Sequence, residues 1–116
     1  VQDGYGFSKQ CIIVYTMTRA RELAQRGIRI NCIAPSPTDS GFMKKLMGEG
    51  QIPEEAVALF LPSNGRYAVG ADMAGPLVLL NSALAGFISG INLPVDFGYC
   101  AEIMMGQRDD LLGIAS

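Results

Sequence analysis

The sequence contains no histidine. Catalytic schemes in which histidine activates a serine or cysteine nucleophile are therefore excluded, and a zinc or other transition-metal site is not expected. The three cysteines, Cys11, Cys32 and Cys100, match neither a zinc-site spacing nor a disulfide framework. We interpret them as reduced thiols, which are typical of a cytoplasmic protein. Acid–base chemistry in this chain must come from tyrosine, lysine, aspartate or glutamate.

Charged residues are also scarce, at 17% of 116 residues, and the formal net charge is −2. With this acidic balance, neither nucleic acid nor an anionic membrane is an expected partner. No run of about 20 apolar residues is present, so no membrane-spanning segment is expected. Hydrophobic residues make up 49% of the sequence. We therefore expect apolar surfaces that a partner subunit or further sequence covers.

The order of predicted elements indicates an α/β fold. Residues 5–25 lack proline and predict a helix, which ends at Arg26 and Gly27. Its first half is apolar nearly all the way round, so we expect it to be buried on two sides. Strands are predicted at 28–34 and at 90–96, both rich in β-branched or apolar residues.

The segment between the two strands predicts helices at 42–48, 53–61 and 71–83, with a loop at 62–70. Pro76 is tolerable only if it lies in the first turn of the last helix. The tail from Phe97 has no assigned structure. Because strands separated by helices imply a right-handed parallel crossover, the chain is predicted to be part of a doubly wound parallel sheet.

Tyr5 and Lys9 lie four residues apart in the segment "YGFSK", inside the first predicted helix. Residues at i and i+4 share one face of a helix. A phenol is a poor proton donor or acceptor at neutral pH, but a nearby ammonium group favours its ionised form. The pair therefore predicts a tyrosine that acts as a general acid–base. An amphipathic tyrosine beside a surface lysine is the alternative that this spacing alone leaves open.

Two further motifs follow: "GIRIN", which runs into "CIAPSPTDS", and then "FISGINLPVDFG". Together with "YGFSK" they resemble the short-chain dehydrogenase/reductase family, which is recognised by Tyr-x-x-Ser-Lys, a Gly-Ile-Arg-Val-Asn strand, Pro-Gly-x-x-x-Thr and a Val-Asp-Gly-Gly ending. The resemblance covers nearly the whole chain, and the tail is most similar to bacterial 3-alpha-hydroxysteroid dehydrogenase/carbonyl reductases. It implies an NAD(P)-dependent oxidoreductase that interconverts a carbonyl and a secondary alcohol.

The resemblance also implies roles for individual residues. Tyr5 would exchange a proton with the substrate oxygen, while Lys9 would support Tyr5 and hydrogen-bond the nicotinamide ribose of NAD or NADP. The backbone of Thr38 would hold the carboxamide, and Asn31 is expected to make a structural hydrogen bond. Ser8 is expected to be structural too. The loop beside the nicotinamide would consist of Pro35, Ser36, Pro37, Thr38 and Ser40.

Some features depart from the family pattern. Ser36 stands where the family has glycine, so the loop must avoid a positive φ there or accept strain. Phe97 replaces the first glycine of the ending. No glycine-rich phosphate-binding turn is present. Residues 1–116 are therefore interpreted as the C-terminal half of a single Rossmann-type domain whose dinucleotide-binding half is absent, which leaves the choice between NAD and NADP open. Alone, this half should not bind a dinucleotide tightly.

Substrate contacts are predicted on the segment after Ser40, where Phe42, Met43 and Met47 supply an adaptable apolar surface. Ordinary helix packing is an equally good interpretation of these three residues. The helix from Tyr5 to Arg26 is expected to form a homodimer or homotetramer interface through its outer apolar face.

Two other functions stay open at this point. Sugar-nucleotide epimerases and dehydratases also use Tyr-x-x-x-Lys, but the compact remainder after the Pro35–Ser36 loop argues against their longer substrate domain. A non-catalytic regulatory protein that keeps the fold is the other alternative, and the intact Tyr5 and Lys9 argue against it.

Overall fold

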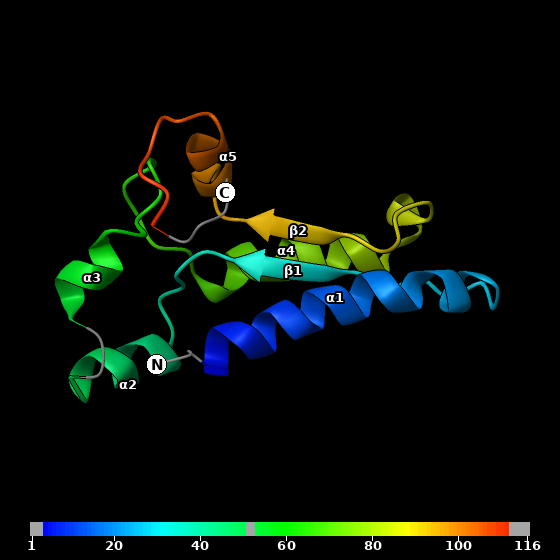
Figure 1. The fold of residues 1–116 in the computed structure, drawn as a ribbon, viewed down its shortest axis with the longest axis horizontal. Coiled ribbons are helices and arrows are strands. Elements are labelled where there is room, and N and C mark those ends of the chain that lie inside the picture. The colour runs from blue at the N-terminus through cyan, green and yellow to red at the C-terminus, as the bar shows by residue number, and fades with distance from the viewer. Residues whose placement is uncertain (1–3, 51–52, 112–116) are drawn as a thin grey trace. The chain divides into compact units, whose positions relative to one another are not determined.

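The computed structural model describes residues 4–50 and 53–111 (Figure 1). The chain divides into two compact units, Val1–Ala34 with Pro76–Leu93 and Pro35–Gly75 with Pro94–Ser116, and each is described by itself. No helix among the described residues is long and apolar enough to cross a membrane. The elements follow in the order α1 (Gly4–Ala24), β1 (Cys32–Pro35), α2 (Gly41–Gly48), α3 (Glu54–Ala58), α4 (Gly70–Asn81), the short 3-10 helix η1 (Ala83–Ala85), β2 (Asn92–Val95) and α5 (Tyr99–Met104).

The helix predicted at the start of the chain is confirmed as α1. The helix ends at Ala24, two residues before the predicted end at Arg26 and Gly27. A turn follows it, and Gly27, with a φ of 68°, adopts the left-handed conformation that favours glycine after a helix. The Thr16 side chain is buried, and its hydroxyl donates to the carbonyl of Ile12 at 2.9 Å. The outer side chains Phe7 and Val14 are 68% and 62% exposed in the single chain. The expected burial of α1 on two sides is therefore not provided by this chain alone.

The two strands are parallel neighbours in one sheet, as predicted. The amide of Cys32 donates to the carbonyl of Ile91, and four residues later the amide of Ser36 donates to the carbonyl of Val95, both at 3.0 Å. Because the partners advance together along both chains, the pairing is parallel.

β1 begins four residues later than the predicted strand at 28–34. Side chains replace the regular strand ladder in this stretch. The Ser89 hydroxyl accepts from the amide of Ile30 at 3.1 Å, and the Asn31 side-chain oxygen accepts from the amide of Ile91 at 3.2 Å. The Asn31 amide group also donates to the carbonyl of Ile88 at 3.0 Å, so the structural hydrogen bond predicted for Asn31 is confirmed.

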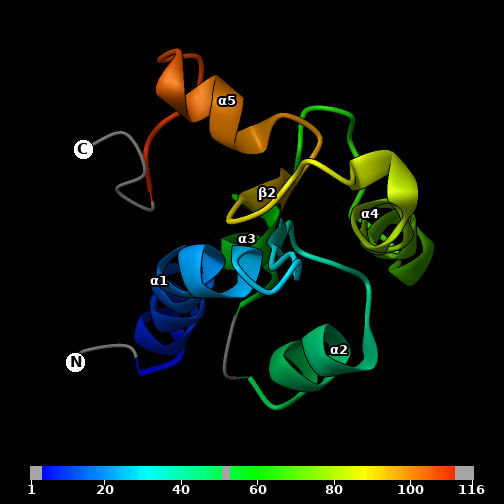
Figure 2. The same cartoon turned by 90° about the vertical axis from the view of Figure 1, so that its right-hand side faces the viewer.

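Within the first unit, α1 and the second half of α4 lie on opposite sides of the strand pair (Figure 2). Arg29 ties the end of α4 to the chain that leads into β1. Its guanidinium donates to the carbonyls of Leu80 at 2.8 Å, Ser82 at 3.2 Å and Ile88 at 3.2 Å. A helix leaves its last carbonyls without intrahelical partners, and a cation is favourable there.

Three predictions about helices in and around the second unit need correction. Pro76 does not lie in a first turn: α4 begins at Gly70, so the proline stands inside the helix, where it lacks the N–H that would bond the carbonyl of Asp72. The helix predicted at 53–61 is shorter, because α3 spans only Glu54–Ala58. The tail after Phe97 forms a helix, α5, that local sequence signals did not indicate.

Candidate active site

The predicted catalytic pair sits on one face of α1. The Lys9 ammonium lies over the Tyr5 ring, 5.0 Å from the ring centroid, and Tyr5 is 59% exposed. The i, i+4 spacing therefore brings the cation and the phenol together, as expected. A cation over the face of a tyrosine ring is attracted by the ring's electron density. The pair is thus held together on an accessible surface, and the proton-transfer role of Tyr5 stays a prediction.

Ser8, between these two residues, has a backbone partner. Its hydroxyl donates to the carbonyl of Tyr5 at 2.7 Å. Serine side chains inside a helix often make this kind of bond to the preceding turn. The structural role expected for Ser8 agrees with this contact.

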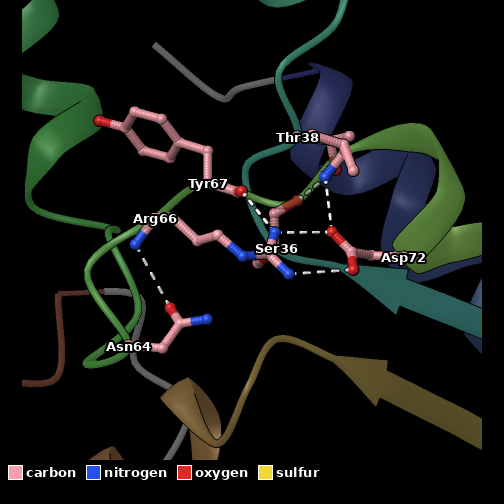
Figure 3. A network of polar contacts seen from close by, with 7 residues as sticks. Ser36, Thr38, Asn64, Arg66, Tyr67 and Asp72 are labelled. Carbon is pink, nitrogen blue, oxygen red and sulfur yellow. Dashed lines mark hydrogen bonds and ion pairs between the residues drawn. The ribbon is translucent and has the colours of Figure 1, made fainter.

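The predicted nicotinamide loop, residues 35–40, leaves the end of β1 in the second unit. Figure 3 shows Ser36 and Thr38, whose hydroxyl donates to the carbonyl of Ser36 at 2.9 Å. Among described residues other than glycine, only Phe97 has a positive φ. Ser36 therefore replaces the family's glycine without entering the strained left-handed region.

Ser40 ends the loop and begins α2. Its side-chain oxygen accepts from the amide of Met43 at 3.3 Å, which makes it the N-cap of that helix. A hydroxyl that accepts in this way keeps its proton for donation to another group. The cofactor contact predicted for Ser40 is compatible with its capping role.

A parallel bridge joins Thr38 to Ala68 and fixes the direction of the loop backbone. The amide of Ala68 donates to the carbonyl of Pro37 at 3.2 Å, and the amide of Asp39 donates to the carbonyl of Ala68 at 2.7 Å. Consecutive residues of an extended chain direct their backbone groups to opposite sides. The N–H and C=O of Thr38 therefore point away from Ala68, and the carboxamide contact predicted for them stays a prediction.

Arg66 and Asp72 form a polar network beside this bridge, which the sequence reasoning did not assign to the site (Figure 3). The guanidinium donates to both carboxylate oxygens, at 2.8 and 3.1 Å. The hydrogen bond from Arg66, followed by the one from the Val69 amide, lowers the pKa of Asp72 to about 2. The same hydrogen bond raises the pKa of Arg66. An acid in the first turn is a helix-start signal for Asp72, but no local pattern in the sequence pairs it with Arg66.

A pocket of about 200 Å³ lies against this network in the second unit. Its lining residues come from the loop after β1, the 62–70 loop, the start of α4 and the end of β2; among them are Ser36, Arg66, Asp72, Val95 and Phe97. The lining therefore combines one ion pair and the polar residues Ser36 and Asn64 with apolar side chains.

The predicted substrate residues lie on α2 of the same unit. Phe42 is 60% exposed, whereas Met43 and Met47 are half-buried. α2 follows the loop directly through the Ser40 cap. This placement accommodates both interpretations of these residues, as a substrate surface and as packing.

The second departure from the family pattern, Phe97, carries backbone strain. Its φ is 51°, and that of Gly98 is 87°, so a bulky side chain occupies a conformation that favours glycine. The preceding Asp96 holds the turn: its two carboxylate oxygens accept from the amides of Gly98 and Cys100, both at 3.0 Å.

Burial, reinforced by Asp96, raises the pKa of the Cys100 thiol to about 11.

The predicted site residues therefore form two groups. Tyr5 and Lys9 belong to the first unit, and the loop and α2 belong to the second. The contacts within each unit are described above, and the catalytic and cofactor-binding roles of these residues stay predictions.

Comparison with known proteins agrees with these motifs. A family model described as enoyl-(acyl carrier protein) reductase matches residues 1–100. Cyclohexanol dehydrogenase from Rhodococcus sp. strain TK6 is 32% identical over 97 residues, which cover 81% of this chain and 34% of that protein. The 3-alpha-hydroxysteroid dehydrogenase/carbonyl reductase of Comamonas testosteroni is 30% identical over 103 residues, covering 89% of this chain and 40% of that protein.

Solved structures give the same result. The crystal structure of a putative 2-deoxy-D-gluconate 3-dehydrogenase from Agrobacterium tumefaciens, with bound NADP, superposes with a TM-score of 0.72 at 32% identity and covers 84% of this chain and 39% of that one. The chain belongs to the short-chain dehydrogenase/reductase family, and its α/β fold with a parallel sheet is confirmed as Rossmann-type. It spans between 34% and 40% of the length of these relatives.

Proposed function

We propose that this chain is the C-terminal half of an NAD(P)-dependent oxidoreductase that interconverts a carbonyl and a secondary alcohol. The observation that carries the proposal is the Tyr5–Lys9 pair, with the ammonium 5.0 Å from the ring centroid on an accessible helix face. Family membership supports it, because the relatives named above are dehydrogenases and reductases. The dinucleotide-binding half of the domain would precede residue 1.

The second unit supports cofactor binding at the loop after β1. The outward N–H and C=O of Thr38 provide one donor and one acceptor for a carboxamide, and the Ser40 hydroxyl retains a proton to donate. Pro35, Ser36 and Pro37 complete the loop, and a proline cannot donate a competing backbone hydrogen bond. A bound nicotinamide would supply or accept the hydride. Both NAD and NADP fit these groups.

In the reduction direction, Tyr5 transfers its phenolic proton to the carbonyl oxygen while hydride reaches the carbonyl carbon, so the product is a neutral alcohol. Lys9 stabilises the phenolate that Tyr5 becomes, because an ammonium within a few ångströms favours the ionised form. In the oxidation direction, the phenolate takes the hydroxyl proton. No histidine or metal is needed for either proton step.

The substrate is proposed to be hydrophobic, such as a hydroxysteroid or another cyclic alcohol. Phe42 on α2 is largely exposed, and Met43 and Met47 are available beside it. Methionine side chains adapt to irregular apolar shapes. The names of the cyclohexanol and hydroxysteroid dehydrogenases favour the same class.

The outer face of α1 is proposed to pack against a second copy, giving a homodimer or homotetramer in the cytoplasm. A hollow of about 420 Å³ lies on this face, lined among others by Phe7, Cys11, Val14 and Tyr15. Exposed apolar side chains gathered on one helix face are typical of an interface.

The test is cofactor binding and turnover by the full-length enzyme. We expect NADH or NADPH to bind in a fluorescence titration, and a hydrophobic cyclic ketone to consume the bound reduced cofactor. A control protein carrying Lys9→Met should fold and lose most turnover. Failure of the wild-type enzyme to bind either dinucleotide would contradict the proposal.

A further inference from the structure

The segment from Arg66 to Val69 is held at both ends by one ion pair. The Arg66 guanidinium, besides contacting Asp72, donates to the carbonyl of Tyr67 at 3.0 Å. The Asp72 carboxylate, besides contacting Arg66, accepts from the amide of Val69 at 2.8 Å. Figure 3 shows these bonds converging between the 62–70 loop and the start of α4. The ion pair thus fixes the backbone immediately before and immediately after Ala68.

Ala68 is the residue that pairs with the nicotinamide loop. It is buried, with 9% of its surface exposed, and its N–H and C=O both bond the loop, to Pro37 and Asp39. These two bonds set which way the Thr38 backbone faces. A rotation of the Ala68 peptide groups would therefore turn the Thr38 donor and acceptor as well.

We propose that Arg66 and Asp72 are positioning residues, which hold Ala68 so that Thr38 presents its backbone N–H and C=O to the nicotinamide end of the cofactor. The inference rests on the proposed function, because it assigns Thr38 the carboxamide contact. Neither side chain touches the cofactor in this scheme. Their effect is specific to the nicotinamide end, and the adenosine end is bound elsewhere.

Because the contact between Arg66 and Asp72 is bidentate, it holds both side chains more firmly than an ordinary surface ion pair does. Arg66 and Asp72 side chains are 55% and 34% exposed, a setting in which a single flexible contact contributes little. Here the guanidinium and carboxylate meet through two parallel hydrogen bonds, and each also bonds the backbone. The amide of Arg66 is held in turn by the Asn64 side-chain oxygen at 3.4 Å.

The test compares two ligands in the full-length enzyme. Asp72→Asn removes the charge and weakens the bidentate contact while keeping a side chain of the same shape. We expect it to weaken NADPH or NADH binding about fivefold, the factor that one ion pair can supply. Binding of the matching nucleotide without nicotinamide, 2′,5′-ADP or ADP-ribose, should be unchanged.

Glu102→Gln is the matched control, because Glu102 pairs with Arg108 at 2.8 Å in the same unit, and its other hydrogen-bond partner, Ser63, lies outside residues 66–69. It should leave both affinities unchanged. The positioning role would be overturned if Asp72→Asn weakened the binding of both ligands equally, or weakened the binding of neither. A wild-type enzyme that binds neither dinucleotide would instead contradict the proposed function itself.

Discussion

Replacing Arg29 with methionine should destabilise the protein by about 2–4 kcal/mol. The guanidinium donates to three carbonyls, and the bonds to Leu80 and Ser82 are partly buried. A hydrogen bond to a charged group contributes roughly 1.5–3 kcal/mol, and a cation at a helix C-terminus about 0.3–1 kcal/mol. The expected loss of stability is smaller than the sum of three such bonds and the helix-end contribution, because the bond to Ile88 is exposed and water can replace it. Methionine keeps much of the apolar stem, so the change reports mainly on these bonds.

Equilibrium urea unfolding measures this effect. The control is Arg26→Met, at an exposed position just after α1 where the arginine side chain bonds no partner in the described part of the chain. The control should change the unfolding free energy by no more than about 0.5 kcal/mol. If Arg29→Met changes the unfolding free energy by no more than the control does, water satisfies the carbonyls equally well and the anchoring role of Arg29 is refuted.

Three further predictions concern stability and reactivity. Because the pKa of Asp72 is about 2 in the folded protein, and about 3.9 is usual in an unfolded chain, its stabilising contribution is present above about pH 4 and lost as the pH falls through 2. The melting-temperature difference between wild type and Asp72→Asn should therefore shrink as the pH falls from about 4 and vanish below about pH 2; a constant difference would contradict the assignment. Alkylation of Cys100, whose thiol pKa is about 11, should speed up about tenfold per pH unit between pH 8 and 10, and a plateau below pH 9.5 in mass-spectrometric rates would count against it. Gly98→Ala should cost about 1–2 kcal/mol, since its φ is 87° and nothing lies within 4 Å of an added Cβ; an unchanged urea midpoint would show that the turn relaxes freely.

The elements with local signals were predictable from sequence. α1 has uninterrupted helix formers and a terminal glycine, and the parallel pairing follows from two strands separated by helices. The Tyr5–Lys9 contact needs only the helical spacing. The structural bond of Asn31 was expected from the resemblance of "GIRIN" to the strand motif of the family.

The features that sequence reasoning missed depend on specific side-chain contacts rather than on helix or strand propensity. α5 lacks a side-chain N-cap of the usual kind, because Gly98 occupies that position in a left-handed conformation and Asp96 supplies the hydrogen bonds instead. Its Tyr99 is buried beneath the Arg108 guanidinium, 4.5 Å from the ring centroid. No local propensity encodes such packing.

The network around Arg66 was missed for a related reason. An arginine and an aspartate six residues apart meet only when the intervening loop folds back, as it does here before α4. The late start of β1 has the same origin, since the Ser89 side chain replaces a ladder bond from a segment 59 residues away.

Turnover by the Tyr5→Phe variant of the full-length enzyme is the decisive measurement for proton transfer by Tyr5. Phenylalanine keeps the ring that Lys9 covers and removes only the hydroxyl. We expect kcat for reduction of a hydrophobic ketone to fall by about 10²–10⁴-fold, the usual contribution of a general acid. The affinity for the reduced dinucleotide should stay within a few-fold of wild type. Retention of more than about a tenth of the wild-type kcat would contradict the assignment of Tyr5 as the proton donor.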